Sequence, residues 1–353
     1  MLTIFLSIVW LGLIGIAVAG AAYREKPKAW HPFSENALVI VPCKGMDITI
    51  EKNLHSIKKQ ECGKIKIVAV VDSINDAAVK TIKDVGIKLA VSSQKYKHCS
   101  GKVAAICTAL SKFKGYSAYA IIDSDVECEH NHIKDLLAPL TDPKIGISTA
   151  YPYFNPIGGF WAKVKMVWGF VGNGMMESEL TRFGWGGSIA FRGGMLGRKE
   201  LAILSKAISD DIALVHIAKQ KGLRIEYVNN AKIKVNVREN RKSFFEWSNR
   251  QTALTLLGNR KLLYMGVSLY LAQLLLLVLG ITLSIAVSLL YLILLLPFAL
   301  SAWKAFQRAK RDRLWVLPIS FIINFIFLWN LIKASKMKQI TWRGRTYPLT
   351  NPF

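Results

Sequence analysis

The stretch that decides the fold is residues 118–128, which read Ala-Tyr-Ala-Ile-Ile-Asp-Ser-Asp-Val-Glu-Cys. Its apolar first half suits a strand buried inside a parallel sheet, and this run ends at Asp123-Ser124-Asp125. Ligands of open α/β sheets bind outside the carboxyl ends of such strands. Two carboxylates one residue apart at that edge can share Mg²⁺ or Mn²⁺, which then binds a diphosphate. The alternative is an Asp-Ser-Asp turn or helix cap without an ion.

Strands and helices alternate on the amino-terminal side of this stretch. We expect strands at residues 37–41, 65–71 and 87–91, and helices at residues 48–60, 77–85 and 101–113. This alternation indicates an α/β domain built on a doubly wound parallel sheet. Asp72 follows the second strand, so we expect it at the same sheet edge as Asp123. An acidic residue there suits hydrogen bonding to a base or ribose, although a plain turn explains it equally well.

Composition indicates a membrane-associated protein. Of the 353 residues, 52% are hydrophobic, and the formal net charge is +24. A chain this apolar and basic is expected to partner an anionic surface, either membrane or nucleic acid. Long apolar segments favour the membrane. The five cysteines have no zinc-type spacing and predict reduced thiols facing the cytoplasm, and we expect His130 and His132 to lie in a polar loop rather than a metal site.

Apolar segments at both ends predict transmembrane helices. Residues 1–22 are followed by basic residues, which favours a retained anchor with its C-terminal end in the cytoplasm. Residues 262–300 are too long for one crossing and predict a helical hairpin that turns near Gly280. Residues 314–332 either cross or lie in the interface, because a crossing would put the basic tail outside. We therefore expect an anchor (1–22), a catalytic domain (23–257) and a C-terminal membrane region with its tail (258–353).

Several segments of the expected catalytic domain have both a structural and a functional interpretation. Residues 157–176 predict a Trp- and Met-rich helix, either in the core or at the membrane interface. Residues 184–188 form a glycine-rich loop that suits close approach of a ligand or a simple turn. Asp210 and Asp211 begin a helix, where the dipole favours carboxylates and where one of them could act as a general base. Residues 238–260 predict a basic amphipathic helix on the membrane surface.

The order of the motifs resembles inverting nucleotide-sugar glycosyltransferases of family 2, and most closely the ceramide glucosyltransferase-like branch, family 21. The similar motifs, in chain order, are Pro42-x-Lys44-Gly45-x-Asp47, Val71-Asp72-Ser73-x-x-Asp76, Gly101-Lys102, Asp123-Ser124-Asp125 and Ser209-Asp210-Asp211. The stretch Trp342-Arg343-Gly344-Arg345-x-Tyr347 is similar to a tail of related bacterial and archaeal enzymes. The resemblance runs over nearly the whole chain.

The resemblance implies a GT-A fold, Rossmann-like and doubly wound, with transmembrane helices at both ends. It implies an enzyme that transfers a hexose from a nucleotide sugar, such as UDP-glucose, to a lipid hydroxyl at the cytoplasmic face of the cell membrane. Nucleic acid is not an expected partner beyond the nucleotide. The implied donor-binding residues are Pro42, Lys44, Asp72, Lys102 and Asp123; the implied ligands of Mg²⁺ or Mn²⁺ are Asp123 and Asp125; the implied catalytic base is Asp211; and Asp210, Trp247, Arg250 and Gln251 are implied on the acceptor and diphosphate side.

The chain departs from these families in one element. They commonly carry Gln/Arg-x-x-Arg-Trp after the third aspartate motif. Here Arg250 or Gln251 can take the first position, but Ala253-Leu254 or Leu254-Thr255 then stands where Arg-Trp belongs. The sequence therefore leaves the identity of the acceptor open. The alternatives are a processive polysaccharide synthase, which would need more membrane spans, and a non-catalytic membrane protein with a degenerate transferase domain.

Overall fold

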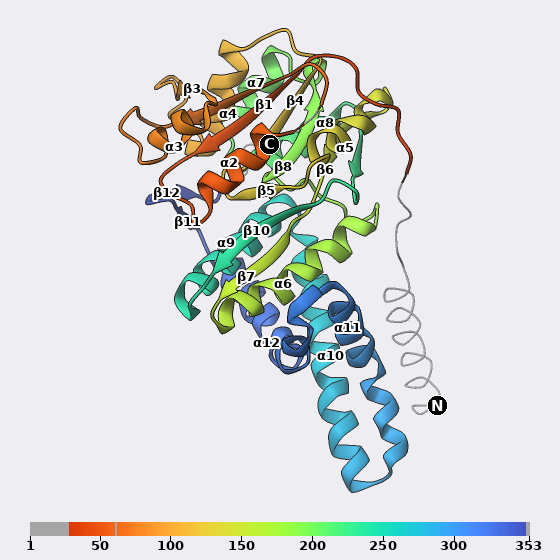
Figure 1. Cartoon of the computed structure of the whole chain (residues 1–353). Coiled ribbons are helices and arrows are strands. Elements are labelled where there is room, and N and C mark those ends of the chain that lie inside the picture. Colours follow the sequence, from red (N-terminus) through yellow and green to blue (C-terminus); the bar gives the residue numbers. More distant parts are fainter. Residues whose placement is uncertain (1–27, 61, 351–353) are drawn as a thin grey trace. The chain divides into compact units, whose positions relative to one another are not determined.

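A computed structural model of the chain describes residues 28–60 and 62–350 (Figure 1). The expected anchor, residues 1–22, lies outside the described residues. The described chain forms two compact units. The sheet unit contains residues 28–157, apart from Glu61, together with Ser178–Val237 and 339–350, and the helical unit contains Gly158–Glu177 and Arg238–Lys338. These units do not follow the expected boundary after residue 257, because two segments before it pack with the apolar helices and the tail packs with the sheet unit.

The sheet unit is built on a seven-stranded sheet with the order β3-β2-β1-β4-β8-β6-β9. The strands are β1 (Ala37–Cys43), β2 (Ile65–Val71), β3 (Lys88–Val91), β4 (Ala118–Ile122), β6 (Ile145–Thr149), β8 (Ser188–Arg192) and β9 (Arg224–Tyr227). Strands β1 to β4 pair in parallel, as the alternation predicts. Strand β8 runs antiparallel between β4 and β6, so the sheet is mixed rather than wholly parallel. Periodicity alone does not reveal strand direction.

Helices cover this sheet, and a second, smaller sheet adjoins it. The helices of the sheet unit are α2 (Ile50–Lys58), α3 (Ala78–Val85), α4 (Gly101–Lys112), α5 (His132–Leu137), α7 (Arg198–Leu204) and α8 (Asp210–Gln220), with 3-10 turns at Ala138–Thr141 and Gly193–Met195. Strands β5 (Val126–Cys128), β10 (Ile233–Arg238) and β7 (Tyr153–Gly158) form the second sheet in that order. Side chains of β1 and β4 pack with α4 and α8 in one buried cluster that includes Ile40 and Ile121. This core holds the carboxyl ends of the strands in place.

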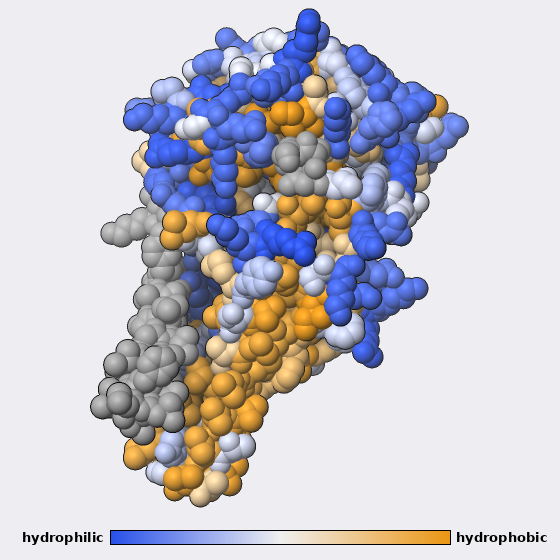
Figure 2. Space-filling view, turned by 180° about the vertical axis from the view of Figure 1, so that it is seen from behind, coloured by the Kyte–Doolittle hydropathy of each residue, from blue (hydrophilic) through white to orange (hydrophobic). Residues whose placement is uncertain are grey.

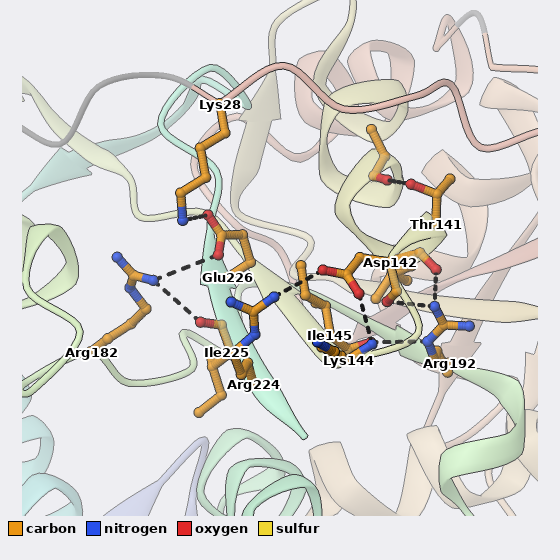
Figure 3. A network of polar contacts seen from close by, with 12 residues as sticks. Lys28, Thr141, Asp142, Lys144, Ile145, Arg182, Arg192, Arg224, Ile225 and Glu226 are labelled. Carbon is orange, nitrogen blue, oxygen red and sulfur yellow. Dashed lines mark hydrogen bonds and ion pairs between the residues drawn. The ribbon is translucent and has the colours of Figure 1, made fainter. Parts of the chain in front are cut away.

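An ion-pair network closes the β9 edge of the large sheet (Figure 3). The buried Glu226 of β9 lies 2.7 Å from Lys28 Nζ and 3.8 Å from Arg182 Nη1. Arg224 lies 2.8 Å from Asp142, while Arg192 donates to the main-chain carbonyls of Asp142 and Ile145. A carboxylate as buried as Glu226 needs charged partners to offset its desolvation. The network ties the chain before β1 to the far edge of the sheet.

The helical unit consists of α-helices joined in places by short 3-10 segments. They are α6 (Phe160–Glu177), α9 (Arg241–Gly258), α10 (Lys261–Ala286), α11 (Leu296–Arg308) and α12 (Val316–Ser335), with 3-10 segments η3 (Leu289–Leu295) and η4 (Lys310–Trp315). The expected helix at residues 157–176 is confirmed as α6. The helical hairpin is also confirmed, but its turn lies at Val287 and Ser288, not near Gly280. Gly280 lies inside α10, where a Cβ would approach Leu295 to 2.6 Å, so this glycine permits close helix packing.

Three segments, Lys261–Ala286, Leu289–Arg308 and Lys310–Ser335, are long and apolar enough to cross a membrane. Figure 2 shows hydrophobic residues gathered over the surface of these helices. Large apolar side chains are highly exposed there, with Ile285 at 83% and Leu290 at 82%. Apolar exposure on this scale is typical of a surface that contacts lipid or protein. The expected C-terminal membrane region therefore has the required helices.

Candidate active site

The loops after β1, β2 and β4 meet at one edge of the large sheet. β1 lies between β2 and β4 and is parallel to both, so the residues that follow the three strands share that edge. Asp72 follows β2 and Asp123 follows β4, so the expectation that both lie at this edge is confirmed. Lys44 follows β1, and its Nζ lies 3.0 Å from Asp72 Oδ2. The Asp123 N–H donates to the carbonyl of Gly187, which fixes the turn after β4.

Lys102 is the central cation of this edge. It lies in the first turn of α4, which Ser100 caps by accepting from the Val103 N–H. Its Nζ lies 2.8 Å from Asp123 Oδ1 and 3.3 Å from Asp210 Oδ1, and the lysine side chain is only 9% exposed. Burial alone would lower the pKa of Lys102, but Asp123 and Asp210 outweigh it and raise the pKa. Lys102 therefore stays charged and joins the motif after β4 to the start of α8.

Asp210 and Asp211 begin α8 in different environments. Asp210 is 3% exposed, and burial raises its pKa to about 7, against the opposing effect of Lys102. Asp211 is half-buried and accepts hydrogen bonds from the Gly186 N–H at 3.0 Å, the Ile212 N–H at 2.8 Å and the Ser209 hydroxyl. The two adjacent carboxylates thus have different partners: Asp210 pairs with Lys102, whereas Asp211 accepts hydrogen bonds from neutral donors.

The glycine-rich loop packs against this cluster through Gly186. The carbonyl of Gly186 accepts from Lys102 Nζ at 3.0 Å, and its N–H donates to Asp211. A Cβ at Gly186 would lie 2.9 Å from both Lys102 Nζ and Asp210 Oδ2. Real Cβ atoms do not approach other atoms so closely without displacing them. Gly186 is therefore glycine because the charged cluster packs directly against its backbone.

The first-strand motif contributes a further carboxylate, Asp47. Its Oδ2 accepts from the hydroxyl of Ser124, the middle residue of Asp123-Ser124-Asp125, at 2.7 Å. Asp76, from the second motif, accepts from the Gly45 N–H at 2.9 Å and so orders the loop after β1. Asp47 and Asp76 are within the quoted motifs, but the sequence assigned them no separate role. The hydrogen bond from Ser124 joins Asp47 to the motif that follows β4.

The C-terminal tail also reaches this edge, which the sequence analysis did not predict. It forms a hairpin of β11 (Gln339–Trp342) and β12 (Arg345–Pro348) within the sheet unit. Arg343 pairs with Asp47, and Arg345 Nη2 lies 3.0 Å from Asp72 Oδ2. The Tyr347 hydroxyl accepts from the Gly101 N–H at 3.2 Å. The only sequence signal was the motif similarity of the tail, since more than 200 residues separate Tyr347 from Gly101.

The carboxylates after β4 suit a divalent cation. Asp123 and Asp125 offer hard oxygen ligands, and a cation bound there would take the place of part of the positive charge that Lys102 and Arg343 now supply. Within residues 28–60 and 62–350, no group of three or more His, Cys, Asp and Glu side chains is arranged to hold a metal. A cation at this pair would therefore take its other ligands from water and from phosphate oxygens, as Mg²⁺ usually does.

The expectation of a polar loop at His130 and His132 is wrong for His132. This residue begins α5, is 1% exposed, and its Nε2 lies 2.9 Å from the Ser188 hydroxyl. Burial lowers its pKa to about 4, so the imidazole is neutral near pH 7. His132 is therefore a hydrogen-bonded core residue beneath the sheet.

Of the remaining expected site residues, Pro42 lies at the carboxyl end of β1, next to this edge. Trp247, Arg250 and Gln251 are on α9 in the helical unit, so the structure does not assign them to the charged cluster. The ring of Trp247 packs against Trp168 of α6, with centroids 4.9 Å apart, and Lys165 Nζ lies 4.1 Å above it.

Comparisons with known proteins identify the fold and the family. The mannosyltransferase PcManGT from Pyrobaculum calidifontis, solved with GDP-Man and Mn²⁺, is 18% identical, with a TM-score of 0.57, over 94% of this chain and 96% of that chain. Glucosyl-3-phosphoglycerate synthase from Mycobacterium tuberculosis, solved with UDP, is 17% identical, with a TM-score of 0.45, over 69% and 83%. The likeness to PcManGT shows a shared fold. No curated protein sequence matches the chain. The family model of glycosyl transferase family 21 matches residues 3–351, and the chain belongs to this family.

Proposed function

We propose that this enzyme transfers a hexose from a nucleotide sugar to a lipid hydroxyl, with inversion, at the cytoplasmic face of a membrane. The observation that carries the proposal is the cluster of Lys102 with Asp123 and Asp210 at the carboxyl edge of the sheet, in a chain of family 21. Ligands of α/β sheets bind at this edge. The apolar helices of the same chain support a membrane-bound acceptor.

The donor and its cation would use the residues after β1, β2 and β4. Asp72 would hold the nucleoside, and Asp123 and Asp125 would bind Mn²⁺ or Mg²⁺, which neutralises charge on the leaving diphosphate. Lys102 would add positive charge there. PcManGT was solved with GDP-Man and Mn²⁺, which supports a nucleotide sugar and a divalent cation. UDP-glucose remains our expected donor, with GDP-mannose as the alternative to be tested.

Asp211 would be the base. Its carboxylate would take the proton of the acceptor hydroxyl while the oxygen attacks the anomeric carbon and the bond to the diphosphate breaks on the opposite side. The N–H of Gly186 and the hydroxyl of Ser209 orient this carboxylate. An oriented carboxylate needs only hydrogen-bond reach of the hydroxyl. Asp210 would act indirectly, by holding Lys102.

The helical unit supplies the features that a lipid acceptor requires. Trp161 of α6 packs on Phe244 and Phe245 of α9, with ring centroids 5.4 and 5.5 Å apart. Aromatic and basic side chains interleave on α6 and α9, as is typical of helices at a membrane interface. The buried Lys165 of α6 pairs with Glu239 at 2.7 Å, which satisfies its charge within the protein.

The proposal is tested by nucleotide release from the purified full-length protein with membrane lipid extract, Mn²⁺ and a panel of UDP- and GDP-sugars. We expect release with one donor, dependent on lipid and lost on chelation. A lipid-linked monosaccharide product would establish the reaction, whereas a long saccharide would identify a polysaccharide synthase. Nucleotide binding without release under any condition would favour a degenerate transferase domain.

Contacts within the helical unit support two membrane crossings after α9 rather than three. The α10–α11 hairpin begins directly after α9, and Arg308 at its end lies 2.7 Å from Glu177 at the end of α6. Both ends of this hairpin therefore lie beside helices that connect directly to the sheet unit. Figure 1 shows the hairpin extending away from α6 as a pair of helices.

The third apolar helix, α12, has both of its ends beside α6. Trp315 at its start contacts Phe160, with centroids 5.9 Å apart, and lies under Lys163. Near its end, Asn330 accepts from Trp168 Nε1 at 3.0 Å and donates to Ser248 of α9. On this proposal α12 would lie along α6 at the membrane interface and would not cross. The basic tail then stays on the catalytic side, in agreement with the positive-inside rule.

Cysteine labelling in sealed vesicles tests this topology. With Cys62 replaced by serine, Val287→Cys at the hairpin turn should react with an impermeant maleimide from the side opposite the catalytic domain. Arg313→Cys before α12 and Lys338→Cys after it should both react only from the catalytic side. Labelling of positions 313 and 338 from opposite sides would show that α12 crosses.

A further inference from the structure

We propose that the C-terminal hairpin, residues 339–348, is part of the donor site. Arg343 binds the diphosphate of the nucleotide, and Arg345 with Tyr347 forms one wall of the nucleoside pocket. The inference rests on the proposed function, because it identifies residues that recognise the donor of that reaction. It adds a segment from the far end of the chain to a site otherwise built from residues 44–211.

The hairpin turn holds Arg343 in an unusual backbone conformation. Arg343 has φ +50° and Gly344 has φ +75°, so both central residues of the two-residue turn are left-handed, as a type I′ turn requires. Glycine, asparagine and aspartate are the usual residues there. An arginine at the first position is less favourable for the turn, and such local conflicts are concentrated at functional sites.

The side chain of Arg343 lies beside Asp47, close enough to Asp123 and Asp125 to feel their charge. It pairs with Asp47, whose other oxygen is bound by Ser124. Burial works against its charge, but Asp47, Asp125 and Asp123 outweigh this effect and raise its pKa. A guanidinium at this place can form a bidentate pair with a phosphate as well as with a carboxylate. When a diphosphate and a cation bind beside Asp123 and Asp125, Arg343 is the tail residue within reach of the new negative charge.

Arg345 and Tyr347 line a cavity beside the start of α4. The cavity has a volume of about 680 Å³, and its lining includes Asp72, Tyr96, Gly101, Arg345 and Tyr347. This is within the size range of pockets for small molecules. Gly101 lies directly against this wall, because a Cβ there would lie 2.9 Å from Arg345 Nη1 and the guanidinium would have to shift.

The two parts of the hairpin predict separable effects on nucleotide binding. Arg343 lies near the carboxylates proposed to hold the cation, so its loss should weaken the binding of a nucleoside diphosphate more than that of the corresponding monophosphate. Arg345 and Tyr347 line the pocket beside Asp72, so their loss should weaken the binding of both nucleotides to the same extent. For Arg343 this contrast separates a direct role in recognition from a general loss of structure, which would weaken binding of both nucleotides alike.

The experiment measures binding of UDP, UMP, GDP and GMP to the full-length protein in detergent with Mn²⁺. Arg343→Asn is the decisive variant, because Asn-Gly is among the preferred pairs for a type I′ turn and should preserve the hairpin. We expect this variant to bind the preferred nucleoside diphosphate with an affinity lower by on the order of 10- to 100-fold, and to lose less affinity for the monophosphate. Lys338→Ala, which removes the same charge from an exposed position before β11, should bind like the wild type.

The outcomes distinguish this inference from the proposed function. If the wild type binds a nucleoside diphosphate and Arg343→Asn binds it equally well, the inference is overturned while the transferase proposal stands. If Arg345→Gln and Tyr347→Phe leave both nucleotides unaffected, the hairpin does not form the pocket wall. If the wild type binds no nucleotide, both proposals are overturned together.

Discussion

Asp211→Asn is expected to lower the rate of sugar transfer by about 10²- to 10⁴-fold, the usual contribution of a general base. The amide has the same shape and can still accept a hydrogen bond from the Gly186 N–H, so the loop against α8 should keep its position. It cannot take a proton from the acceptor hydroxyl. Donor binding should therefore remain close to that of the wild type, and the loss should appear in kcat.

Single-turnover transfer with a saturating lipid acceptor is the appropriate measurement, alongside nucleotide binding. Asp142→Asn is the matched control, because it makes the same chemical change at a carboxylate that pairs with Arg224 at the β9 edge. It should leave kcat unchanged. Turnover of Asp211→Asn within a few-fold of the wild type would remove Asp211 from the role of base.

Lys102→Met is expected to destabilise the sheet unit by about 3–5 kcal/mol, the usual cost of removing one partner of a buried ion pair. The lysine lies between Asp123 and Asp210, and its loss leaves the buried Asp210 carboxylate without its cation. Thermal unfolding of the full-length protein in detergent measures the effect. Transfer should be lost as well, because Lys102 lies at the proposed diphosphate site.

A double variant separates the structural from the chemical role of Lys102. Lys102→Met combined with Asp210→Asn removes one negative charge together with the lysine, so it should recover much of the lost stability. It should not recover transfer. Lys221→Met, which breaks an exposed pair with Glu200, is the control and should change stability little. A Lys102→Met protein as stable as the wild type would show that the cluster tolerates the missing charge.

The sequence by itself was sufficient for strands β1 to β4, their polar ends and the family. The apolar runs that became β1, β2 and β4 stop where Lys44, Asp72 and Asp123 begin, and a parallel sheet necessarily brings such ends to one edge. The composition of each segment predicts these strands, because a run of apolar residues allows a strand to be buried in the sheet. The lengths of the apolar C-terminal segments could likewise be inferred from the sequence.

Only the tertiary structure decided which distant segments complete the site and where the helices turn. The antiparallel β8 and the turn after α10 depend on packing partners that periodicity does not reveal. The pairing of Arg343 with Asp47 joins residues almost 300 positions apart, through contacts that no local pattern encodes. Likewise, Gly186 is explained only by the side chains that pack against it, Lys102 and Asp210. A local pattern determines how a segment folds, whereas charge neutralisation and close packing in three dimensions determine which segments meet.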